Sequence, residues 1–202
     1  MDGRVVVMWL YRISLLMFLV SITACGEPNL PSPYHAVDVS WQLAKADFHL
    51  TDHNGKLRSL EDFSGKVVVL FFGYTHCPEV CPTTLADLAQ VMRQLGKHAE
   101  RVQVLFVTLD PEHDTPELLA KYITSFDPTF LSLRGDTQAT AQAAKAFGVV
   151  FSKQSNKYGE YTLDHSDGTF LIGHQGHPLL RSPYGQRVEL LTNDIKLLVA
   201  IN

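Results

Sequence analysis

The stretch Lys66-Val-Val-Val-Leu-Phe-Phe-Gly-Tyr-Thr-His-Cys-Pro-Glu-Val-Cys-Pro-Thr-Thr-Leu85 sets the organisation of this chain. Residues 67–72 are six apolar residues in a row without polar alternation, which is typical of a strand covered on both faces. Gly73 ends this run. Apolar residues then recur at helical spacing, at Leu85, Leu88, Val91, Met92 and Leu95. The sequence therefore predicts a buried strand, a loop and a helix in direct succession.

Two cysteines occupy the predicted loop, and each is followed by a proline. Pro78 and Pro82 disfavour the α conformation of Cys77 and Cys81, so the C-x-x-x-C segment is predicted to be loop. Pro82 suits the first position of a helix, which makes Cys81 the expected N-cap. At the positive end of a helix the thiolate is favoured, so we expect both thiols to ionise more readily than an ordinary cysteine.

Chain length, net charge and cysteine count limit the class of protein. A chain of 202 residues is long enough for one domain with appendages. The formal net charge of −4 is spread along the sequence, and no basic patch with interleaved aromatic residues occurs, so nucleic-acid binding is not expected. One of the three cysteines belongs to a targeting signal, described next. The remaining pair is too small for a disulfide scaffold and indicates a working pair.

The N-terminus is typical of a secreted bacterial lipoprotein. Residues 1–24 contain a positive n-region and a ten-residue apolar core at 13–22, as signal peptides do. The segment Ile22-Thr-Ala-Cys-Gly26 resembles the lipobox, in which the cysteine is lipidated and becomes the mature N-terminus. We therefore expect residues 1–24 to be a lipoprotein-type signal peptide and Cys25 to be the lipidation site.

An uncleaved membrane anchor is the alternative for the same segment. Residues 5–24 are long enough to cross a bilayer, but Arg12 would then lie within the membrane at a cost of several kcal/mol. In either case the domain is tethered to a membrane and lies outside the cytoplasm, on the periplasmic face for a lipoprotein. Residues 25–42 are expected to form the lipid-anchored linker, and residues 43–202 the folded domain.

The rest of the chain alternates strands with helices. Residues 48–60 predict an N-terminal hairpin, with Asn54-Gly55 as its tight turn. A polar stretch leads to residues 161–166, to which no element is assigned. Further strands are expected at 102–109, 129–133, 149–153, 169–172 and 178–181, and further helices from about 115, at 137–147 and at 186–201. This order predicts an α/β fold, a thioredoxin-like sandwich with an N-terminal hairpin extension, in which reactive cysteines follow the first core strand.

A pair of thiols at a helix N-terminus has two chemical uses. It can exchange electrons with disulfides, for which C-x-x-C is the usual spacing in this fold. The extra residue between Cys77 and Cys81 widens the loop and lets both sulfurs converge on one ion. Thiolates select soft or borderline ions such as Cu(I), and an imidazole extends such a site to Cu(II). A third ligand would have to come from elsewhere in the chain.

Three segments together resemble the Sco/SenC family of copper chaperones. They are Thr75-His-Cys-Pro-Glu-Val-Cys-Pro82, Asp110-Pro-Glu-His-Asp-Thr-Pro116 and Tyr161-Thr-Leu-Asp-His-Ser166. Their order and spacing match the signatures of that family, and the similarity runs from about Phe48 to the C-terminus. A joint match of three segments is far more specific than any one of them.

The resemblance implies a copper site and a biological role. It implies that Cys77, Cys81 and His165 bind one copper ion per chain, as Cu(I) or Cu(II), and that Asp164 orients the imidazole or tunes the site. It also implies delivery of copper to the dinuclear CuA site of cytochrome c oxidase. Expected partners are the copper-bearing oxidase subunit or another copper-site client, and a periplasmic thiol reductant or copper donor.

Some residues depart from the family pattern or have simpler interpretations. The family commonly has arginine where this chain has His113, which weakens the carry-over of partner-docking roles to that loop. His174 and His177 flank a turn and are expected to be solvated, with a secondary copper-loading site as the alternative. For Cys77 and Cys81 the simpler interpretation is a structural disulfide, and a disulfide is also compatible with a copper-free resting state.

Two other functions use the same cysteines. A thiol-disulfide reductase, which would maintain the cysteines of a copper-site protein, needs the pair but not His165. A peroxidase is not supported, because Leu70 and Tyr74 occupy the Pro and Thr positions of the peroxidatic pattern relative to Cys77. The sequence therefore favours a metallochaperone over an enzyme, with thiol-disulfide exchange as the alternative activity.

Overall fold

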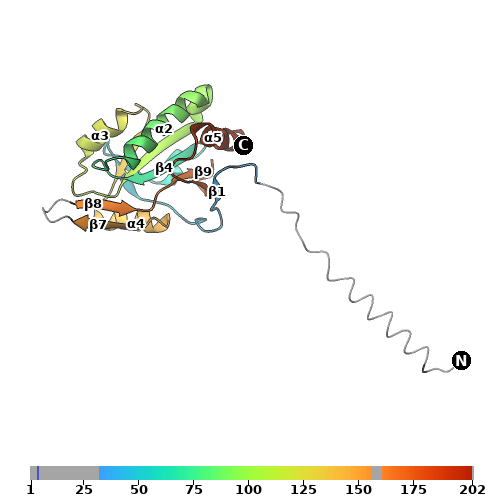
Figure 1. The fold of residues 1–202 in the computed structure, drawn as a ribbon, viewed down its shortest axis with the longest axis horizontal. Coiled ribbons are helices and arrows are strands. Elements are labelled where there is room, and N and C mark those ends of the chain that lie inside the picture. Colours follow the sequence, from blue (N-terminus) through green and yellow to red (C-terminus); the bar gives the residue numbers. More distant parts are fainter. Residues whose placement is uncertain (1–3, 5–31, 156–160, 202) are drawn as a thin grey trace. The chain divides into compact units, whose positions relative to one another are not determined.

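The computed structural model describes residues 32–155 and 161–201, together with Arg4. Residues Pro33–Asn202 group into one compact unit (Figure 1). Apart from Arg4, the predicted signal peptide lies outside the described residues, as do the predicted lipidation site at Cys25 and residues 26–31 of the predicted linker. Of the helices in the described part, none combines the length and the apolar character needed to cross a bilayer.

Eight strands form the main sheet. They are β1 (Val37–Asp38), β2 (Leu50–Asp52), β3 (Leu57–Arg58), β4 (Val67–Gly73), β5 (Val102–Thr108), β6 (Leu131–Arg134), β9 (Thr169–Ile172) and β10 (Pro178–Ser182). Their order across the sheet is β1-β10-β9-β4-β5-β6-β2-β3. Strand β4 runs parallel to β5, with Val67 opposite Val102, and antiparallel to β9, with Val69 opposite Leu171. The loop after β4 therefore starts in the middle of the sheet.

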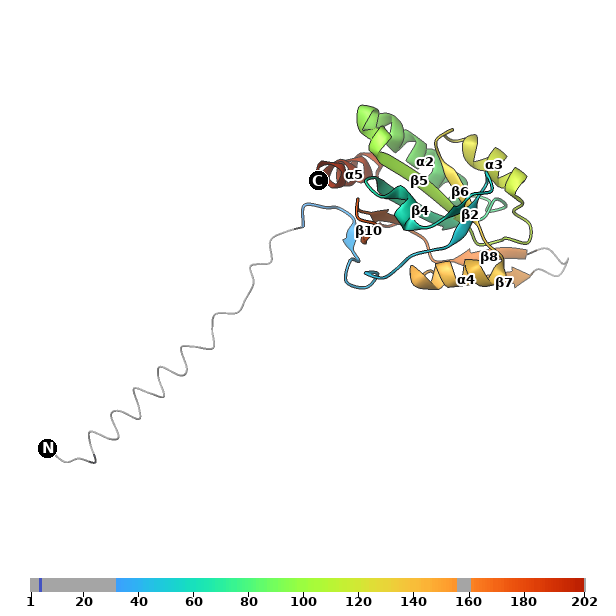
Figure 2. The same cartoon turned by 180° about the vertical axis from the view of Figure 1, so that it is seen from behind.

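Helices cover both faces of this sheet, which is why β4 is apolar without alternation. All seven residues of β4 are buried. Its odd-numbered residues pack in one cluster with α2 (Val80–Leu95), α3 (Pro116–Thr124) and α5 (Val188–Ala200). Its even-numbered residues pack in a second cluster with α4 (Thr137–Ala146). Figures 1 and 2 show α2, α3 and α5 on one side of the sheet and α4 on the other.

A second sheet contains only β7 (Phe151–Ser155) and β8 (Tyr161–His165). The two strands pair antiparallel, with Phe151 opposite His165. Leu163 is 4% exposed and packs with the α4 side of the core, as does the half-buried ring of Phe151. Strand β8, for which the sequence pattern predicts no element, carries His165.

Most of the predicted boundaries agree with the structure. The N-terminal hairpin pairs Leu50 with Arg58, as expected from its Asn-Gly turn. Helix α3 begins after Thr115, whose side chain accepts the N–H of Leu118, and helix α4 begins after Asp136. Strand β6 starts two residues later than predicted, at Leu131 rather than at position 129.

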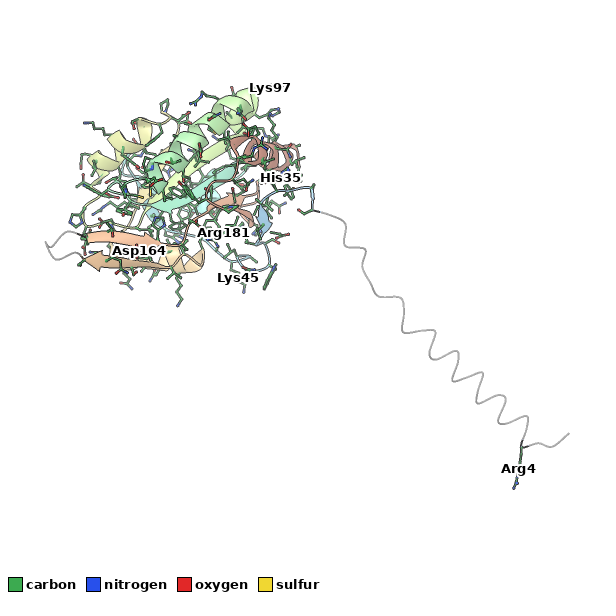
Figure 3. The ribbon with its side chains drawn as sticks, viewed as in Figure 1. Arg4, His35, Lys45, Lys97, Asp164 and Arg181 are labelled. Carbon is green, nitrogen blue, oxygen red and sulfur yellow. The ribbon has the colours of Figure 1, made fainter. Side chains whose placement is uncertain are left out.

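The folded unit begins earlier than the predicted boundary at residue 43. Strand β1 pairs with β10, so part of the predicted linker belongs to the main sheet. The main-chain N–H groups of His35 and Ala36 donate to the carboxylate of Asp194 on α5, which is 0% exposed. Figure 3 shows His35 beside α5. Ala36 and Val39 are buried, which explains why these residues pack on the domain.

Candidate metal centre

The two cysteines lie on either side of the point where α2 begins. Cys77 is half-buried in the loop after β4, whereas Cys81 is buried as the second residue of α2. The N-cap is Glu79, so the prediction that Cys81 is the N-cap and lies in the loop was wrong. Proline fits anywhere in the first turn, because the N–H groups of that turn have no acceptor within the helix. Pro82 therefore did not mark the first helical residue.

The two sulfurs are joined by hydrogen bonds that make them unequal. The main-chain N–H of Cys81 lies 3.4 Å from the Sγ of Cys77. The Cys81 thiol donates to the Cys77 sulfur and, with the N–H groups of Cys81 and Glu79, lowers the pKa of Cys77 to about 5. The same donated thiol proton, together with burial, raises the pKa of Cys81. At neutral pH the pair is therefore one thiolate and one thiol, rather than the two readily ionised thiols that we expected.

The imidazole of His165 approaches the Cys81 sulfur from the second sheet. Its Nε2 lies 4.0 Å from the Sγ of Cys81. Its Nδ1 lies 3.1 Å from the main-chain carbonyl oxygen of Ser166, which can only accept a hydrogen bond. Nδ1 must therefore carry the proton, so the lone pair of the neutral ring is on Nε2, toward Cys81. This is the tautomer that binds a metal through Nε2.

Tyr74 connects the cysteine loop to the strand that carries this histidine. The side chain is 3% exposed, and its hydroxyl oxygen accepts the main-chain N–H of Leu163 at 3.3 Å. Its ring packs edge-on against that of His165, with centroids 6.3 Å apart. No local pattern in the sequence marks Tyr74 as part of this site, because its role depends on a residue 89 positions away.

Gly73 makes room for the buried sulfur. A Cβ at this position would lie 2.7 Å from the Sγ of Cys81 and 3.0 Å from the Cε2 of Phe106. Both distances are shorter than ordinary van der Waals contacts, and both neighbours are 0% exposed. The glycine therefore does more than end the apolar run, because it lets α2 bring Cys81 against the end of β4.

Asp164 does not contact the ring nitrogen that it was expected to orient. That nitrogen, Nδ1 of His165, faces the carbonyl oxygen of Ser166 instead. The Asp164 side chain is exposed on β8 (Figure 3) and lines the cavity described next. A contribution of Asp164 to this site would therefore come from its charge at the rim.

An open cavity of about 670 Å³ gives solvent access to the site. It lies between the start of α2 and β8, and its lining includes Cys77 and His165 but not Cys81. Acidic side chains of Glu79, Asp164 and Asp167 also line it. Cys77 and His165 are thus accessible from solvent, whereas Cys81 is buried.

The ring of His113 is engaged by two side chains of the protein. Nδ1 of His113 lies 3.2 Å from the Asp110 carboxylate and makes a short contact with the hydroxyl of Tyr161, which donates to Asp110 at 2.6 Å. Carboxylate oxygens of Asp110 and Glu112 and a nitrogen of His113 lie within 4.8 Å of one another. However, Glu112 pairs with Lys153 at 2.6 Å, so these groups bond to protein partners. They tie the loop after β5 to β7 and β8.

His174 is not the solvated turn residue that we expected. Its Nε2 lies 2.9 Å from the carbonyl oxygen of Leu198 in the last turn of α5, and its Nδ1 lies 3.1 Å from that of Gly65. Both ring nitrogens thus face main-chain oxygens, which leaves neither of them for a secondary copper site. His177 is exposed, as predicted.

Comparisons with known proteins identify relatives over most of the chain. A family model described as SCO1/SenC matches residues 40–200. Human "Protein SCO2 homolog, mitochondrial" is 39% identical over 147 residues, which are 71% of this chain and 54% of that protein. The chain therefore spans about half the length of the curated relatives that it matches, 54% and 52% for the human and bovine proteins.

Solved structures agree with this match. Bradyrhizobium japonicum ScoI with copper bound is 37% identical, with a TM-score of 0.70, over 76% of this chain and 98% of that one. Apo Sco1 from Thermus thermophilus is 41% identical, with a TM-score of 0.69, over 76% of this chain and 90% of that one. The predicted α/β, thioredoxin-like fold is thereby confirmed.

Proposed function

The chain belongs to the SCO1/SenC family, and on this premise we propose that it is a membrane-tethered, extracytoplasmic copper metallochaperone. In this role Cys77, Cys81 and His165 bind one copper ion, and the copper is delivered to the CuA site of cytochrome c oxidase or to another copper-site client. Copper as the ion is supported by the copper-bound relative at 37% identity. The human relative, at 39% identity, supports membership of the Sco family. The solved protein BsSco is described as a member of the Sco family of cytochrome c oxidase assembly proteins.

One observation carries this proposal: Cys81 lies beside both of the other candidate ligands, although His165 comes from a distant part of the chain. The Sγ of Cys81 and the Nε2 of His165 lie 4.0 Å apart across 84 positions of sequence, and Cys77 is hydrogen-bonded to Cys81. Two sulfurs select soft ions, and an imidazole extends the site to Cu(II). The donor set therefore fits copper in both oxidation states.

The protonation of the pair also suits uptake of a cation. Cys77 is already a thiolate at neutral pH, because its pKa is lowered to about 5 by the donated thiol of Cys81. When both sulfurs coordinate copper the proton of Cys81 must leave, and the neutral ring of His165 offers the lone pair of its Nε2. Binding should begin at Cys77 and His165, which line the cavity, and finish at Cys81.

Copper stoichiometry and spectroscopy of the reduced, full-length protein in detergent test the proposal. We expect one copper per chain and a sulfur-to-Cu(II) charge-transfer band that is lost in Cys77→Ala and Cys81→Ala variants and lost or strongly shifted in His165→Ala. The matched control is His177→Ala, which removes an exposed histidine that does not line this cavity and should leave the band unchanged. Failure of the wild-type protein to bind copper would end the chaperone proposal.

The alternative is a thiol-disulfide reductase that maintains the cysteines of a copper-site protein. It is favoured by the same inequality of the sulfurs, because an accessible thiolate at Cys77 beside a protonated, buried Cys81 resembles an attacking and a resolving thiol. Exchange with an oxidised dicysteine peptide, measured for wild type and His165→Ala, separates the two functions. Equal rates in both proteins would favour the reductase, since only the copper site needs the imidazole.

The membrane tether of this proposal is a lipid on Cys25. Its support is the lipobox-like segment Ile22-Thr-Ala-Cys-Gly26 behind an apolar core. Mass spectrometry of membrane-extracted protein should show a diacylglyceryl adduct on Cys25. An unprocessed Met1 would contradict the lipoprotein proposal and favour the uncleaved anchor.

A further inference from the structure

Asp114 is a buried carboxylate that the copper site, as described so far, does not use. Its side chain is 0% exposed. One carboxylate oxygen accepts the hydroxyl of Thr75 at 2.5 Å. The other accepts the main-chain N–H of Thr75 at 3.1 Å and the hydroxyl of Thr108 at 2.5 Å. Burying a carboxylate is costly unless it is hydrogen-bonded, so these three donors are what makes the position tenable.

The three donors come from two different segments, which the carboxylate joins to a third. Thr75 lies two positions before Cys77 in the loop after β4, and Thr108 is the last residue of β5. Asp114 itself precedes Thr115, the N-cap of α3, and its own N–H donates to the carbonyl of Asp110 at 2.9 Å. The carboxylate therefore fastens the cysteine loop to the end of β5 and the start of α3.

The anchored segments leave the cysteine loop little freedom. Thr108 is 0% exposed and lies opposite Gly73 in the parallel pair of β4 and β5. Helix α3 packs on the same core cluster as α2. The loop between β4 and α2 is thus fixed at Thr75 as well as at its two ends. A loop fixed in this way holds Cys77 where the N–H groups of Cys81 and Glu79 reach its sulfur.

We propose that Asp114 is a positioning residue of the copper site, which acts on Cys77 through Thr75. The inference rests on the proposed function and deepens it, because it assigns the part of the protein that keeps the accessible sulfur in place. Asp114 does not contact copper in this proposal. Its effect is to keep the loop in its binding conformation before an ion arrives, so that no ordering of the loop is needed when copper binds.

Removing one hydroxyl tests the proposal without removing the charge. Thr75→Val keeps the size of the side chain and the N–H bond to Asp114 but loses the hydroxyl donor. We expect its Cu(I) affinity to fall about 10–100-fold, as is typical when a partner behind a metal ligand is lost. The sulfur-to-Cu(II) band should shift, and alkylation of Cys77 in the copper-free protein should slow several-fold. Thr75→Ser restores the hydroxyl and should restore all three.

A matched control separates positioning from loss of stability. Asp194→Asn alters another carboxylate that is 0% exposed, one that holds His35 and Ala36 and lies outside this site. We expect it to lower the free energy of unfolding but to leave Cu(I) affinity and Cys77 alkylation unchanged. Asp114→Asn, by contrast, should lower both the Cu(I) affinity and the rate of Cys77 alkylation. If the Asn variant does not fold, Thr75→Val and Thr75→Ser carry the test alone.

Failure of the positioning role of Asp114 can be distinguished from failure of the chaperone proposal. Wild-type copper affinity, alkylation rate and spectrum in a folded Thr75→Val protein would overturn the positioning role of Asp114. Equal losses in Thr75→Val and Asp194→Asn would overturn it too, since general destabilisation would then suffice. If the wild-type protein binds no copper, the chaperone proposal fails, whereas the alkylation comparison still decides whether Asp114 positions Cys77.

Discussion

Gly73→Ala adds a single methyl group against the buried sulfur of Cys81. The new Cβ would lie 2.7 Å from the Sγ of Cys81, 3.0 Å from Cε2 of Phe106 and 3.2 Å from Cε1 of Phe71. Ordinary contacts begin at 3.4 Å, so the shortfall at the sulfur is 3.4 − 2.7 = 0.7 Å. The main chain cannot give way easily, because β4 is paired on both sides and the Gly73 carbonyl accepts the N–H of Leu109 at 2.7 Å.

The expected losses of stability and copper affinity depend on which neighbours of the new methyl group can move. Phe71, Cys81 and Phe106 are each at most 1% exposed, so none of them has open space to move into. Overpacking of this kind costs about 1–3 kcal/mol of unfolding free energy. To relieve this overpacking, α2 must shift away from β4. That shift moves the Cys81 sulfur away from its position beside Cys77 and His165. We therefore expect Cu(I) affinity to fall at least about tenfold, the equivalent of about 1.4 kcal/mol.

The assay combines urea unfolding of the copper-free protein with competition for Cu(I) against a coloured chelator. Gly173→Ala is a matched control, because its Cβ would lie 2.8 Å from the Cδ1 of Leu179. That neighbour is the end of a flexible, half-buried side chain, which can rotate away. We expect the control to change the unfolding free energy by less than about 0.5 kcal/mol and to leave copper affinity unchanged.

Three results would refute this reasoning. A Gly73→Ala protein with wild-type stability and copper affinity would show that α2 does not press Cys81 against β4. Equal losses in Gly73→Ala and Gly173→Ala would show that the strain is not specific to the sulfur. A stability loss without a copper effect would separate packing from ligand placement, and would contradict the link that we draw between them.

Further expectations concern pH and the second sheet. Because the folded pKa of Cys77 is lowered from 9.0 to about 5, alkylation of Cys77 should have its midpoint near pH 5. The unfolding free energy of the copper-free protein should therefore rise with pH between about pH 5 and 9, and this gain should be lost as the pH falls through 5. Above pH 9 the unfolding free energy should decline, because the raised pKa of Cys81 disfavours folding there. A urea midpoint that stays flat from pH 5 to 9 would contradict this expectation. Tyr161→Phe removes a donor to the buried carboxylate of Asp110 and should cost about 1–3 kcal/mol. Hydrogen exchange should then accelerate in β8 more than in the main sheet, and uniform acceleration would refute a local role.

The parts of the fold that sequence predicted well are those decided by local patterns. The run at 67–72 lacks alternation because both faces of β4 are covered, so composition alone revealed it. The sequence predicts Asp114 or Thr115 as the cap of α3 and Asp136 as the cap of α4. Thr115 and Asp136 are the N-caps, because their side chains accept N–H groups three residues ahead. The start of α2 was mispredicted, since Pro82 fits several positions of a first turn.

The parts of the site that sequence could not predict depend on distant partners. From the residues alone His165 was an ordinary loop histidine, and only its resemblance to a family gave it a role. Ser166 supplies the oxygen that orients this ring through its main chain, which leaves no mark in the sequence. Tyr74 and His174 bond main-chain groups 89 and 24 positions away, respectively. Such pairings arise only after the sheet and helices have been assembled.

The distance along the chain between Cys81 and His165 has a consequence for stability. An ion bound by both residues would close a loop of 84 residues between α2 and β8. In the described part of the chain, β8 pairs only with β7, in a sheet separate from the main one. By the loop-closure estimate used for disulfides, such a cross-link is worth about 4–5 kcal/mol against unfolding. Copper would thus act as a removable cross-link, and its transfer to a client would leave β8 held by the packing of Leu163 and by the hydrogen bond from the Leu163 N–H to Tyr74.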